Sequence, residues 1–564
     1  MSDIRIAYSL GEYQSSVNHA LDEMRKDNII ERIWAKDYTL WKPTPDEITN
    51  RLGWLDAPEE TLDKIEYLRK VLKPFTGGGT KDVVLFGMGG SSLAAEVFGK
   101  IFGPHTGYPQ LQVLDTTDPA FILKVSQSLD LEKTLFVVSS KSGTTMEITS
   151  LFQYFYNLTL KKLGSSTGSH FIFITDEGSP MEKIAEKLSL YHTFLNNPHI
   201  GGRYSALSFP GIIPATIIGV NVEKLLQKAI DAAQTEKTQL ISKILNTSGA
   251  YLGAVLGTLA RMGRDKLTFI MPPRWKSFGD WLEQLIAEST GKDRKGILPV
   301  LNEPTFDTAV YGRNRVFVFF QDKQENNSPK IDALTKAGHP VITIKINDDY
   351  DLGSQMFIWE MATALAAYFL NVNPFDQPNV EATKNHARRI IAQYREKKKL
   401  PQNKAILTTD QCDVYGNSNS LTVADTLKYF LNQAAVNDYV CLQVFLSPSP
   451  EIDKALTKLR KAIGEKYHLP VTWGYGPRYL HSTGQLHKGD SGNGLFIQLT
   501  ADERIDVDIP DQIGKDDSSL AFGVLKTAQA QGDWQALLDA GRRIIRLHCK
   551  KDAAAGLNNF ASNL

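Results

Sequence analysis

Cysteine is scarce in this 564-residue sequence, which contains only Cys412, Cys441 and Cys549, far apart along the chain. An odd number of widely spaced cysteines argues against a disulfide framework and against a cysteine-based metal site, and it fits a reducing compartment. The H-x-x-x-H and C-x-x-C spacings typical of many metal sites are also missing. We therefore expect a protein that uses neither a metal nor another cofactor.

Long apolar runs and an excess of charge of one sign are missing as well. No uninterrupted apolar run approaches the roughly 18 residues that a bilayer-spanning helix needs. The first residues, MSDIRIAYSLGEYQSSV, show neither the pattern of an export signal nor that of a transit peptide. Lys plus Arg and Asp plus Glu number 63 each, so the overall charge favours neither nucleic acid nor an anionic membrane. We expect a cytoplasmic protein without a nucleic-acid or membrane partner.

Changes in hydrophobic pattern divide the chain into four expected parts. Residues 1–75 have apolar positions at helical spacing and predict a helical N-terminal segment. Residues 76–245 alternate short apolar runs with amphipathic stretches, which predicts a parallel sheet covered by helices on both faces. Residues 246–400 restart the same order after a long helix near 223–245, and they end in a helical stretch. Residues 401–564 predict a smaller α+β domain, so the fold class is α/β with two doubly wound parallel-sheet domains.

A cluster of hydroxyl side chains follows the third predicted strand, in the run SKSGTT. It contains Ser140, Lys141, Ser142 and Thr145, and it lies where a strand should end and a helix should begin. Free backbone N–H groups and the helix dipole favour an anion at such a turn. A simple helix cap would need only one hydroxyl. The run therefore indicates a phosphate site, although it is not a nucleotide P-loop.

A second strand-to-helix turn, GMGGSS, contains Gly89, Gly90 and Ser91. It does not match the dinucleotide fingerprint G-x-G-x-x-G, because Ser92 stands where the last glycine should be, although Asp115 ends the next predicted strand as a ribose-binding acid might. Structural glycines in a tight turn explain the motif equally well. Neighbouring strand ends of a parallel sheet are where ligands bind, so we expect this turn beside the hydroxyl-rich one.

Two charged residues are candidates for proton transfer and charge stabilisation. Glu288 lies near the end of a predicted helix, where the dipole and partial burial would raise the pKa of a carboxyl group, as suits a general base. Arg203 follows two glycines in GGRYS, which would let a guanidinium approach a ligand closely. Taken alone, each residue is also compatible with an ordinary surface position.

Together these motifs carry a family resemblance. GMGGSSLA, SSKSGTTMEIT, GGRYS, EQLIAESTGK and NPFDQPNVEATK, in this order, resemble the phosphoglucose isomerase family, which is built from two sugar-isomerase domains. Including the late segment GPRYLHSTGQLHKG, the chain most resembles the isomerase half of bifunctional transaldolase/phosphoglucose isomerase proteins. The resemblance implies an enzyme of glycolysis and gluconeogenesis that interconverts glucose 6-phosphate and fructose 6-phosphate without a cofactor. It also implies a homodimer.

The resemblance also implies roles for individual residues. Glu288 would move a proton between C2 and C1, Arg203 would stabilise the cis-enediolate, and Lys384 would lie near the ring oxygen. The expected substrate-binding residues are Gly89, Gly90, Ser91, Ser140, Lys141, Ser142, Thr145 and Gln284.

Ring opening is where the sequence departs from the family. Conventional members use a loop histidine about thirty residues after the base, but no histidine occurs between Lys292 and Val318. His481 is our preferred replacement, and His487 or Lys384 acting alone are the alternatives. Two other functional classes remain open at this point. One is a non-catalytic regulator that binds sugar phosphate, and the other is a nicotinamide-dependent dehydrogenase, a hypothesis that rests on GMGG and Asp115.

Overall fold

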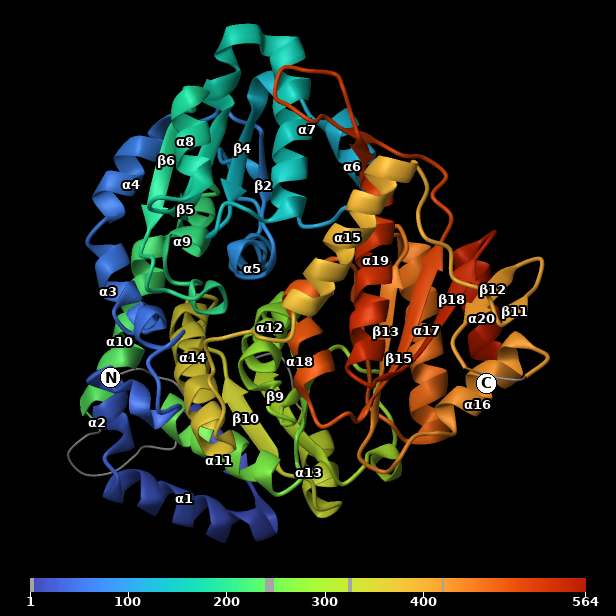
Figure 1. The fold of residues 1–564 in the computed structure, drawn as a ribbon. Coiled ribbons are helices and arrows are strands. Elements are labelled where there is room, and N and C mark those ends of the chain that lie inside the picture. Colours follow the sequence, from blue (N-terminus) through green and yellow to red (C-terminus); the bar gives the residue numbers. More distant parts are fainter. Residues whose placement is uncertain (1–4, 239–247, 323–326, 418–419) are drawn as a thin grey trace.

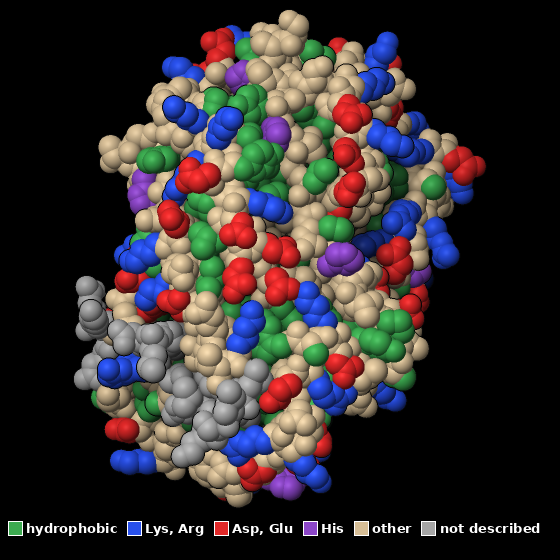
Figure 2. Space-filling model, turned by 90° about the vertical axis from the view of Figure 1, so that its left-hand side faces the viewer, with side chains coloured by type: hydrophobic (Ala, Val, Ile, Leu, Met, Phe, Trp, Pro, Cys, Tyr) green, Lys and Arg blue, Asp and Glu red, His purple; other side chains and the backbone are tan. Residues whose placement is uncertain are grey.

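The structure is a computed structural model that describes residues 5–238, 248–322, 327–417 and 420–564. Three open β-sheets, each flanked by helices, make up the molecule (Figure 1). The mixed α/β class with parallel sheets is confirmed. No helix in the described part of the chain is long and apolar enough to cross a membrane. On the face drawn in Figure 2, basic and acidic side chains are interspersed.

The first sheet is entirely parallel and has the order β3-β2-β4-β5-β6. Its strands are β2 (Asp82–Phe86), β3 (Gln110–Leu114), β4 (Thr134–Ser139), β5 (Phe171–Asp176) and β6 (His192–Asn196). The flanking helices are α5 (Leu93–Phe102), α6 (Pro119–Ser128), α7 (Met146–Leu163), α8 (Pro180–Lys187) and α9 (Phe209–Ile217). Successive side chains of β2 enter two different cores, Val83 and Leu85 in one and Val84 and Phe86 in the other. Burial on both faces explains why the strand is a continuous apolar run.

The second sheet has the order β1-β10-β9-β7-β8. Its strands are β7 (Lys266–Ile270), β8 (Leu298–Val300), β9 (Arg315–Gln321) and β10 (Val341–Lys345), with β1 (Arg5–Ser9) antiparallel at the edge. Its helices are α11 (Gly249–Arg261), α12 (Lys276–Thr290), α13 (Ser328–Lys336) and α14 (Asp351–Leu370). The prediction of a helical N-terminal segment was therefore wrong for β1. This short strand pairs with the edge strand β10, whose backbone groups would otherwise be unpaired on that side.

The rest of the N-terminal segment is helical or irregular. It contains α1 (Gln14–Lys26), α2 (Ile29–Trp34), α3 (Ala57–Leu62) and α4 (Ile65–Leu72). The long helix expected near residues 223–245 is present as α10 (Val222–Thr238), and residues 239–247 lie outside the described part of the chain. The helical stretch expected up to Tyr394 is divided into α14 and α15 (Glu381–Lys397). The interval NVNPFDQPNV separates them, because two prolines cannot continue a helix.

The third sheet has the order β11-β12-β18-β15-β13-β14. Four strands are parallel: β13 (Tyr439–Phe445), β14 (Val471–Tyr475), β15 (Gly494–Ala501) and β18 (Arg543–Cys549). At one edge, β12 (Cys412–Tyr415) pairs antiparallel with β18, and β11 (Leu407–Thr408) pairs antiparallel with β12. Its helices are α16 (Val423–Leu431), α17 (Pro450–Tyr467), α18 (Gly484–Gly489), α19 (Phe522–Asp539) and α20 (Ala553–Asn563). A separate ribbon pairs β16 (Asp508–Ile509) with β17 (Leu520–Ala521).

The second and third sheets share one strand arrangement. The parallel strands have the order β10-β9-β7-β8 in the second sheet and β18-β15-β13-β14 in the third, so in both the fourth and third strands of the chain are followed by the first and second. In both, an antiparallel strand flanks the fourth. Helices α17 and α19 lie between successive parallel strands of the third sheet, as α12 and α13 do in the second. The C-terminal unit is thus built from strand-helix-strand crossovers like the other two, which is more regular than the expected α+β domain.

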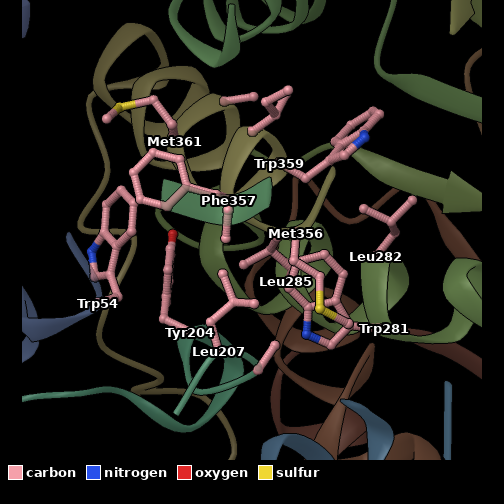
Figure 3. Close-up of a cluster of buried hydrophobic side chains, with 14 of the residues drawn as sticks. Trp54, Tyr204, Leu207, Trp281, Leu282, Leu285, Met356, Phe357, Trp359 and Met361 are labelled. Carbon is pink, nitrogen blue, oxygen red and sulfur yellow. The ribbon is translucent and has the colours of Figure 1, made fainter. Parts of the chain in front are cut away.

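One apolar core connects the parts of the chain that carry the sequence motifs. Figure 3 shows Trp54 of the N-terminal segment beside Tyr204 of the GGRYS loop and Phe357 of α14, with Trp281 and Leu285 of α12 nearby. The ring centroids of Trp54 and Tyr204 are 5.4 Å apart. Because interiors are close-packed, this cluster fixes the position of α12 against the GGRYS loop.

Candidate active site

The hydroxyl-rich turn lies between the end of β4 and the start of α7, as the sequence predicts. Within it, the Ser140 hydroxyl accepts a hydrogen bond of 3.2 Å from the Gly143 backbone N–H, and the hydroxyls of Ser142 and Thr144 are 3.0 Å apart. Gly143 has φ +66°, a conformation that glycine adopts without strain. Ser140 therefore closes the turn, while the other hydroxyls remain available to a ligand.

A cavity of about 180 Å³ opens beside this turn and is lined by Ser142, Thr144 and Thr145 from the turn, Lys384 from α15 and His481 from the C-terminal unit. The carboxyl ends of β2 and β4 are the topological switch point of the first sheet, where ligands of such sheets bind. The cavity thus combines hydroxyl and cationic groups from three different parts of the chain. This composition suits a phosphorylated ligand.

His481 is held by a buried carboxylate at the start of α7. The Nε2 of His481 is 2.9 Å from the Glu147 carboxylate, which also accepts a hydrogen bond of 2.8 Å from the amide of Gln529. Burial alone would raise the pKa of Glu147, but the charge and hydrogen bond of His481 lower that pKa overall. An ionised Glu147 would hold a proton on Nε2 through a charge-assisted hydrogen bond.

His487, the alternative histidine, does not line this cavity. Its side chain is fully buried, and neither ring nitrogen has a hydrogen-bond partner among the described residues. Burial lowers the pKa of His487 to about 3. A neutral, enclosed ring of this kind is a packing residue in the core.

Glu288 lies in the last turn of α12 with its carboxylate between Arg203 and Gln284, and none of these three residues lines the 180 Å³ cavity. One oxygen is 3.2 Å from Nη1 of Arg203, and the other accepts a hydrogen bond of 3.0 Å from the amide of Gln284. The Gln284 amide also donates to the backbone carbonyl of His481 at 2.8 Å. The side chain of Glu288 is only 12% exposed, so it is not the surface glutamate that the sequence alone allowed. Gln284 connects this carboxylate directly to the segment that carries His481.

The guanidinium of Arg203 is locked in place by the interval between α14 and α15. Its Nη2 donates to the carbonyls of Pro374 and Asp376 at 2.7 and 2.9 Å, and its Nε donates to the Ser289 hydroxyl at 2.9 Å. Nη1 donates to the amide oxygen of Gln377 at 3.0 Å. A cation with so many fixed acceptors is preorganised, and its Nη1 points to Glu288.

Two glycines of GMGGSS bring the other motifs into contact. A Cβ on Gly90 would lie 1.9 Å from the Gly202 carbonyl oxygen, so GMGGSS and GGRYS touch backbone to backbone. Gly89 has φ +55°, and a Cβ there would meet the amide of Gln284 and the carbonyl of His481 at 2.6 and 2.8 Å. Only glycine fits at either position.

Several expected residues do not reach the 180 Å³ cavity. Lys141 forms an ion pair with Asp176 and donates to the Pro198 carbonyl at 2.8 Å, and Ser91 and Lys141 line a different, smaller cavity. Asp115, the candidate ribose-binding acid, is buried and 2.9 Å from Arg478. The dehydrogenase alternative thus loses the free acid on which it rested.

Other polar residues of the site were not singled out from the sequence. Glu147, Lys292 and Gln377 all lie inside the quoted motifs, but their contacts join segments far apart in the chain. Lys292 is 2% exposed and 2.7 Å from the Asp376 carboxylate. Burial, followed by the charge of Arg203, lowers the pKa of Lys292 to about 8. The motifs contained these residues and so could have drawn attention to them. Their partners could be identified only from the folded structure.

The arrangement combines a mostly buried carboxylate, a fixed guanidinium, a histidine with its own carboxylate and a hydroxyl-rich anion site. Proton abstraction next to a carbonyl needs such a base together with a preorganised cation at the developing oxyanion.

Comparisons with known proteins agree with this chemistry. The model of the phosphoglucose isomerase family matches residues 60–312. A probable glucose-6-phosphate isomerase of Methanococcus maripaludis is 30% identical over 384 residues, which cover 60% of this chain and 84% of the relative. Glucose-6-phosphate isomerase of Staphylococcus epidermidis is 30% identical over 407 residues, covering 63% of this chain and 90% of that protein.

Solved structures support the same fold. A glucose-6-phosphate isomerase of Chlamydia trachomatis aligns with a TM-score of 0.58 and 17% identity, over 70% of this chain and 89% of its own. A hypothetical protein of Thermus thermophilus aligns with a TM-score of 0.56 and 24% identity, over 69% of this chain and all of its own. With curated relatives at 30% identity matched over most of their length, the chain belongs to the phosphoglucose isomerase family.

Proposed function

We propose that this protein is an aldose–ketose isomerase that interconverts glucose 6-phosphate and fructose 6-phosphate in glycolysis and gluconeogenesis. One observation carries the proposal. Glu288 forms an ion pair with Arg203 and accepts a hydrogen bond from Gln284, which also donates to the carbonyl of His481, and the imidazole of His481 lines the cavity beside the hydroxyl-rich turn. This connection supports a joint action of base, cation, histidine and anion site, as the reaction requires.

The phosphate of the substrate is assigned to Ser142, Thr144 and Thr145, with Ser140 shaping the turn. These hydroxyls and the start of α7 offer hydrogen-bond donors to an anion. Binding the phosphate, which does not react, holds the reacting carbons against the base and so lowers the entropic part of the barrier. Lys141 and Ser91 are assigned indirect roles, because they line the neighbouring smaller cavity.

Ring opening is assigned to His481. With Nε2 held by Glu147, the proton on the other ring nitrogen, Nδ1, would pass to the ring oxygen as the bond between that oxygen and the anomeric carbon breaks. The anomeric hydroxyl would release its proton to water as the carbonyl forms. Lys384 lines the same cavity and is half exposed, with its ammonium 3.6 Å from Glu381. It is assigned to stabilise the opened oxygen, and it is the rival for the protonation step.

Isomerisation is assigned to Glu288 and Arg203. The Glu288 carboxylate would remove the C2 proton of the open aldose and return it to C1, while the hydroxyl proton moves between O1 and O2. The enediolate formed between these steps carries negative charge on oxygen, and the fixed guanidinium of Arg203 would stabilise it.

A regulator that only binds sugar phosphate would need the hydroxyl-rich turn but neither Glu288 nor the locked Arg203. Their pairing at 3.2 Å therefore favours the enzyme. We further propose a homodimer that acts in the cytoplasm, supported by the resemblance to the family and by three buried, unpaired cysteines that suit a reducing compartment.

Replacing Glu288 by Gln tests the function directly. Glu288→Gln keeps the size of the side chain and one acceptor oxygen but removes the base, so we expect kcat to fall by roughly 10³-fold with fructose 6-phosphate binding retained. Turnover would be measured in a coupled assay and binding by calorimetry.

Glu283→Gln, on the same helix, is the matched control. Glu283 lines a different cavity, and burial raises its pKa to about 8, so the carboxyl is already mainly neutral at pH 7 and we expect little change. Unchanged turnover in Glu288→Gln would refute the isomerase assignment, and tight sugar-phosphate binding by a wild-type protein without turnover would establish the regulator instead.

A further inference from the structure

A large cavity in the C-terminal unit has no role in the proposed reaction. This C-terminal cavity, of about 710 Å³, is lined by Phe445 of β13, Thr500 and Ala501 of β15, Arg546 and His548 of β18, and the segment 399–405, among others. The active-site cavity is about 180 Å³, and the two have no lining residue in common. The hollow therefore needs its own explanation.

Its position in the fold is that of a ligand site. Helix α17 follows β13 and packs on one face of the third sheet, whereas α19 follows β15 and packs on the other. The two strands are neighbours, so the sheet has its topological switch point between them. The lining residues Phe445 and Ala501 are the last residues of these strands. Open parallel sheets bind ligands outside the carboxyl ends of the strands at this point.

Arg546 supplies the chemistry. Its side chain is only 6% exposed, and no carboxylate of the described residues forms an ion pair with it. Nε donates to the Gln498 amide oxygen at 2.7 Å, and the guanidinium lies 4.8 Å from the ring centre of Trp534 and 5.8 Å from that of Tyr415. Nη1 has no hydrogen-bond partner in the described parts of the chain. A buried cation is costly unless an anion accompanies it.

The other charges of the C-terminal cavity are mostly neutralised within the protein. Lys550 is 2.7 Å from Asp413, His548 is 3.1 Å from Asp502, and Lys526 pairs with Asp118 at 2.7 Å and with Glu503. Lys399, exposed at the rim, forms no ion pair with the described residues. Two cations, one deep and one at the rim, therefore remain for a ligand, and the rings of Phe445 and Tyr415 offer it apolar surface.

We propose that the C-terminal cavity is a second binding site, for a small organic anion whose carboxylate or phosphate group pairs with Arg546. The planar guanidinium suits either oxyanion, because it can donate two parallel hydrogen bonds. Lys399, which is exposed at the rim of the cavity, supplies the second positive charge. The proposal does not depend on the isomerase assignment, since none of these residues lines the active-site cavity.

Calorimetric titration of the full-length protein tests the proposal. Citrate and inorganic phosphate are titrated separately, and any binding at the active site is recognised because substitutions in the C-terminal cavity leave it unchanged. We expect one further anion per chain to bind to the wild-type protein. Arg546→Lys keeps the charge but loses the two parallel N–H donors of the guanidinium, so it should weaken binding on the order of tenfold. Lys399→Ala should weaken binding severalfold.

Two matched variants separate a specific site from a general charge effect. Arg543→Lys changes an arginine on the same strand that pairs with Asp438 at 2.9 Å, and Lys397→Ala removes an exposed charge that does not line the cavity. Both should bind like the wild type. Thermal unfolding of every variant checks that the fold is intact, and Lys399→Ala tests the site even where Arg546→Lys is unstable.

The two anions distinguish the ligand sources. Binding of citrate alone identifies a carboxylate ligand, and binding of phosphate alone identifies a phosphate ester; both support the site if the Arg546 and Lys399 dependence holds. Absence of binding by both anions overturns the proposal. So does binding that is equal in all four variants.

Discussion

At the scale of single residues, His481 and His487 show how six positions of separation produce opposite environments. His481 faces a cavity and contacts a carboxylate at 2.9 Å, so it can exchange a proton with a ligand. His487 packs against the rings of Phe496 and Tyr479, with centroid distances of 5.0 and 5.8 Å. Only the first has the surroundings of an acid–base group.

A substrate that cannot close its ring tests the role of His481. We expect His481→Asn to lower kcat for fructose 6-phosphate by roughly 10²-fold or more, because ring opening loses its acid. With 5-deoxyfructose 6-phosphate, which lacks the hydroxyl that forms the furanose, turnover should be nearly unchanged. Equal losses with both substrates would contradict a ring-opening role, and the complementary pattern in Lys384→Met would assign the step to the lysine.

The burial of His487 predicts how the protein responds to acid. Its pKa is about 3 in the folded chain, against about 6.5 when unfolded, so between these values the unfolded chain binds more protons and stability falls with falling pH. From pH 6.5 to 5 this one group should lower the free energy of unfolding by about 2 kcal/mol. His487→Phe, an apolar ring of similar size, should remove that loss, as measured by urea unfolding at both pH values.

An exposed histidine provides the control for this measurement. His19→Gln removes a histidine whose side chain is 76% exposed and should leave the pH dependence as it is in the wild type. An identical acid response of His487→Phe and wild type would show that the ring is already protonated in the folded state.

At the scale of elements, the contact between GMGGSS and GGRYS holds the first sheet against the site. Gly90→Ala would place a methyl group 1.9 Å from the Gly202 carbonyl oxygen, and backbone cannot yield as a flexible side chain can. We expect a loss of about 3 kcal/mol in unfolding free energy and a large loss of activity, measured by denaturant unfolding and the coupled assay.

The other side of the same contact gives a matched comparison. A Cβ on Gly202 would meet nothing within 4 Å, so Gly202→Ala should unfold like the wild type. If Gly90→Ala were equally stable, the two loops would have to separate at little cost, and the contact could not be what positions Arg203.

Elements were the part of the fold that the sequence predicted well. The runs at β2, β4, β5, β7 and β9 are apolar because both faces of each strand are buried, and this pattern is local. Strand β1 escaped notice because RIAYS is short and is stabilised by pairing with β10, more than 300 residues away. Pairing partners at that distance leave no periodic signal in the sequence.

At the scale of the whole molecule, Arg478 connects all three sheet units. It lies on the C-terminal unit, forms an ion pair with Glu96 of α5, is 2.9 Å from Asp115 after β3, and is 3.8 Å from Asp280 of α12. Removing it would leave three acidic groups close together with little solvent. We expect Arg478→Met to lower the unfolding free energy by roughly 3 kcal/mol, seen in thermal and denaturant unfolding.

An exposed arginine shows what an ordinary ion pair contributes. Arg25→Met breaks a pair of 2.6 Å with Asp22 on α1, where the arginine side chain is 46% exposed, and should change stability by less than about 1 kcal/mol. Equal effects of the two substitutions would mean that Arg478 does not connect the units.

The candidate site could be predicted from the sequence only in pieces. Glu288, Arg203 and the turn at residues 140–145 lie in recognisable motifs. The structure pairs Glu288 with Arg203 and links it through Gln284 to the segment of His481, whose side chain lines the cavity beside the turn. The choice between His481 and His487 depended on which ring faces the cavity. The pairing of Lys141 with Asp176 depended on β5, the neighbouring strand of β4 in the sheet. Both are consequences of tertiary packing, which no local pattern records.

The late position of His481 also has a consequence for biosynthesis. The base, the guanidinium and the anion-binding turn are all translated before residue 300, yet the imidazole follows about 190 residues after Glu288, and Gln529 of α19, which donates to Glu147, comes later still. With ring opening assigned to His481, we expect that a nascent chain on the ribosome cannot turn over sugar phosphate until its C-terminal unit has emerged and docked. Catalytic competence would mark the end of folding rather than an early stage of it.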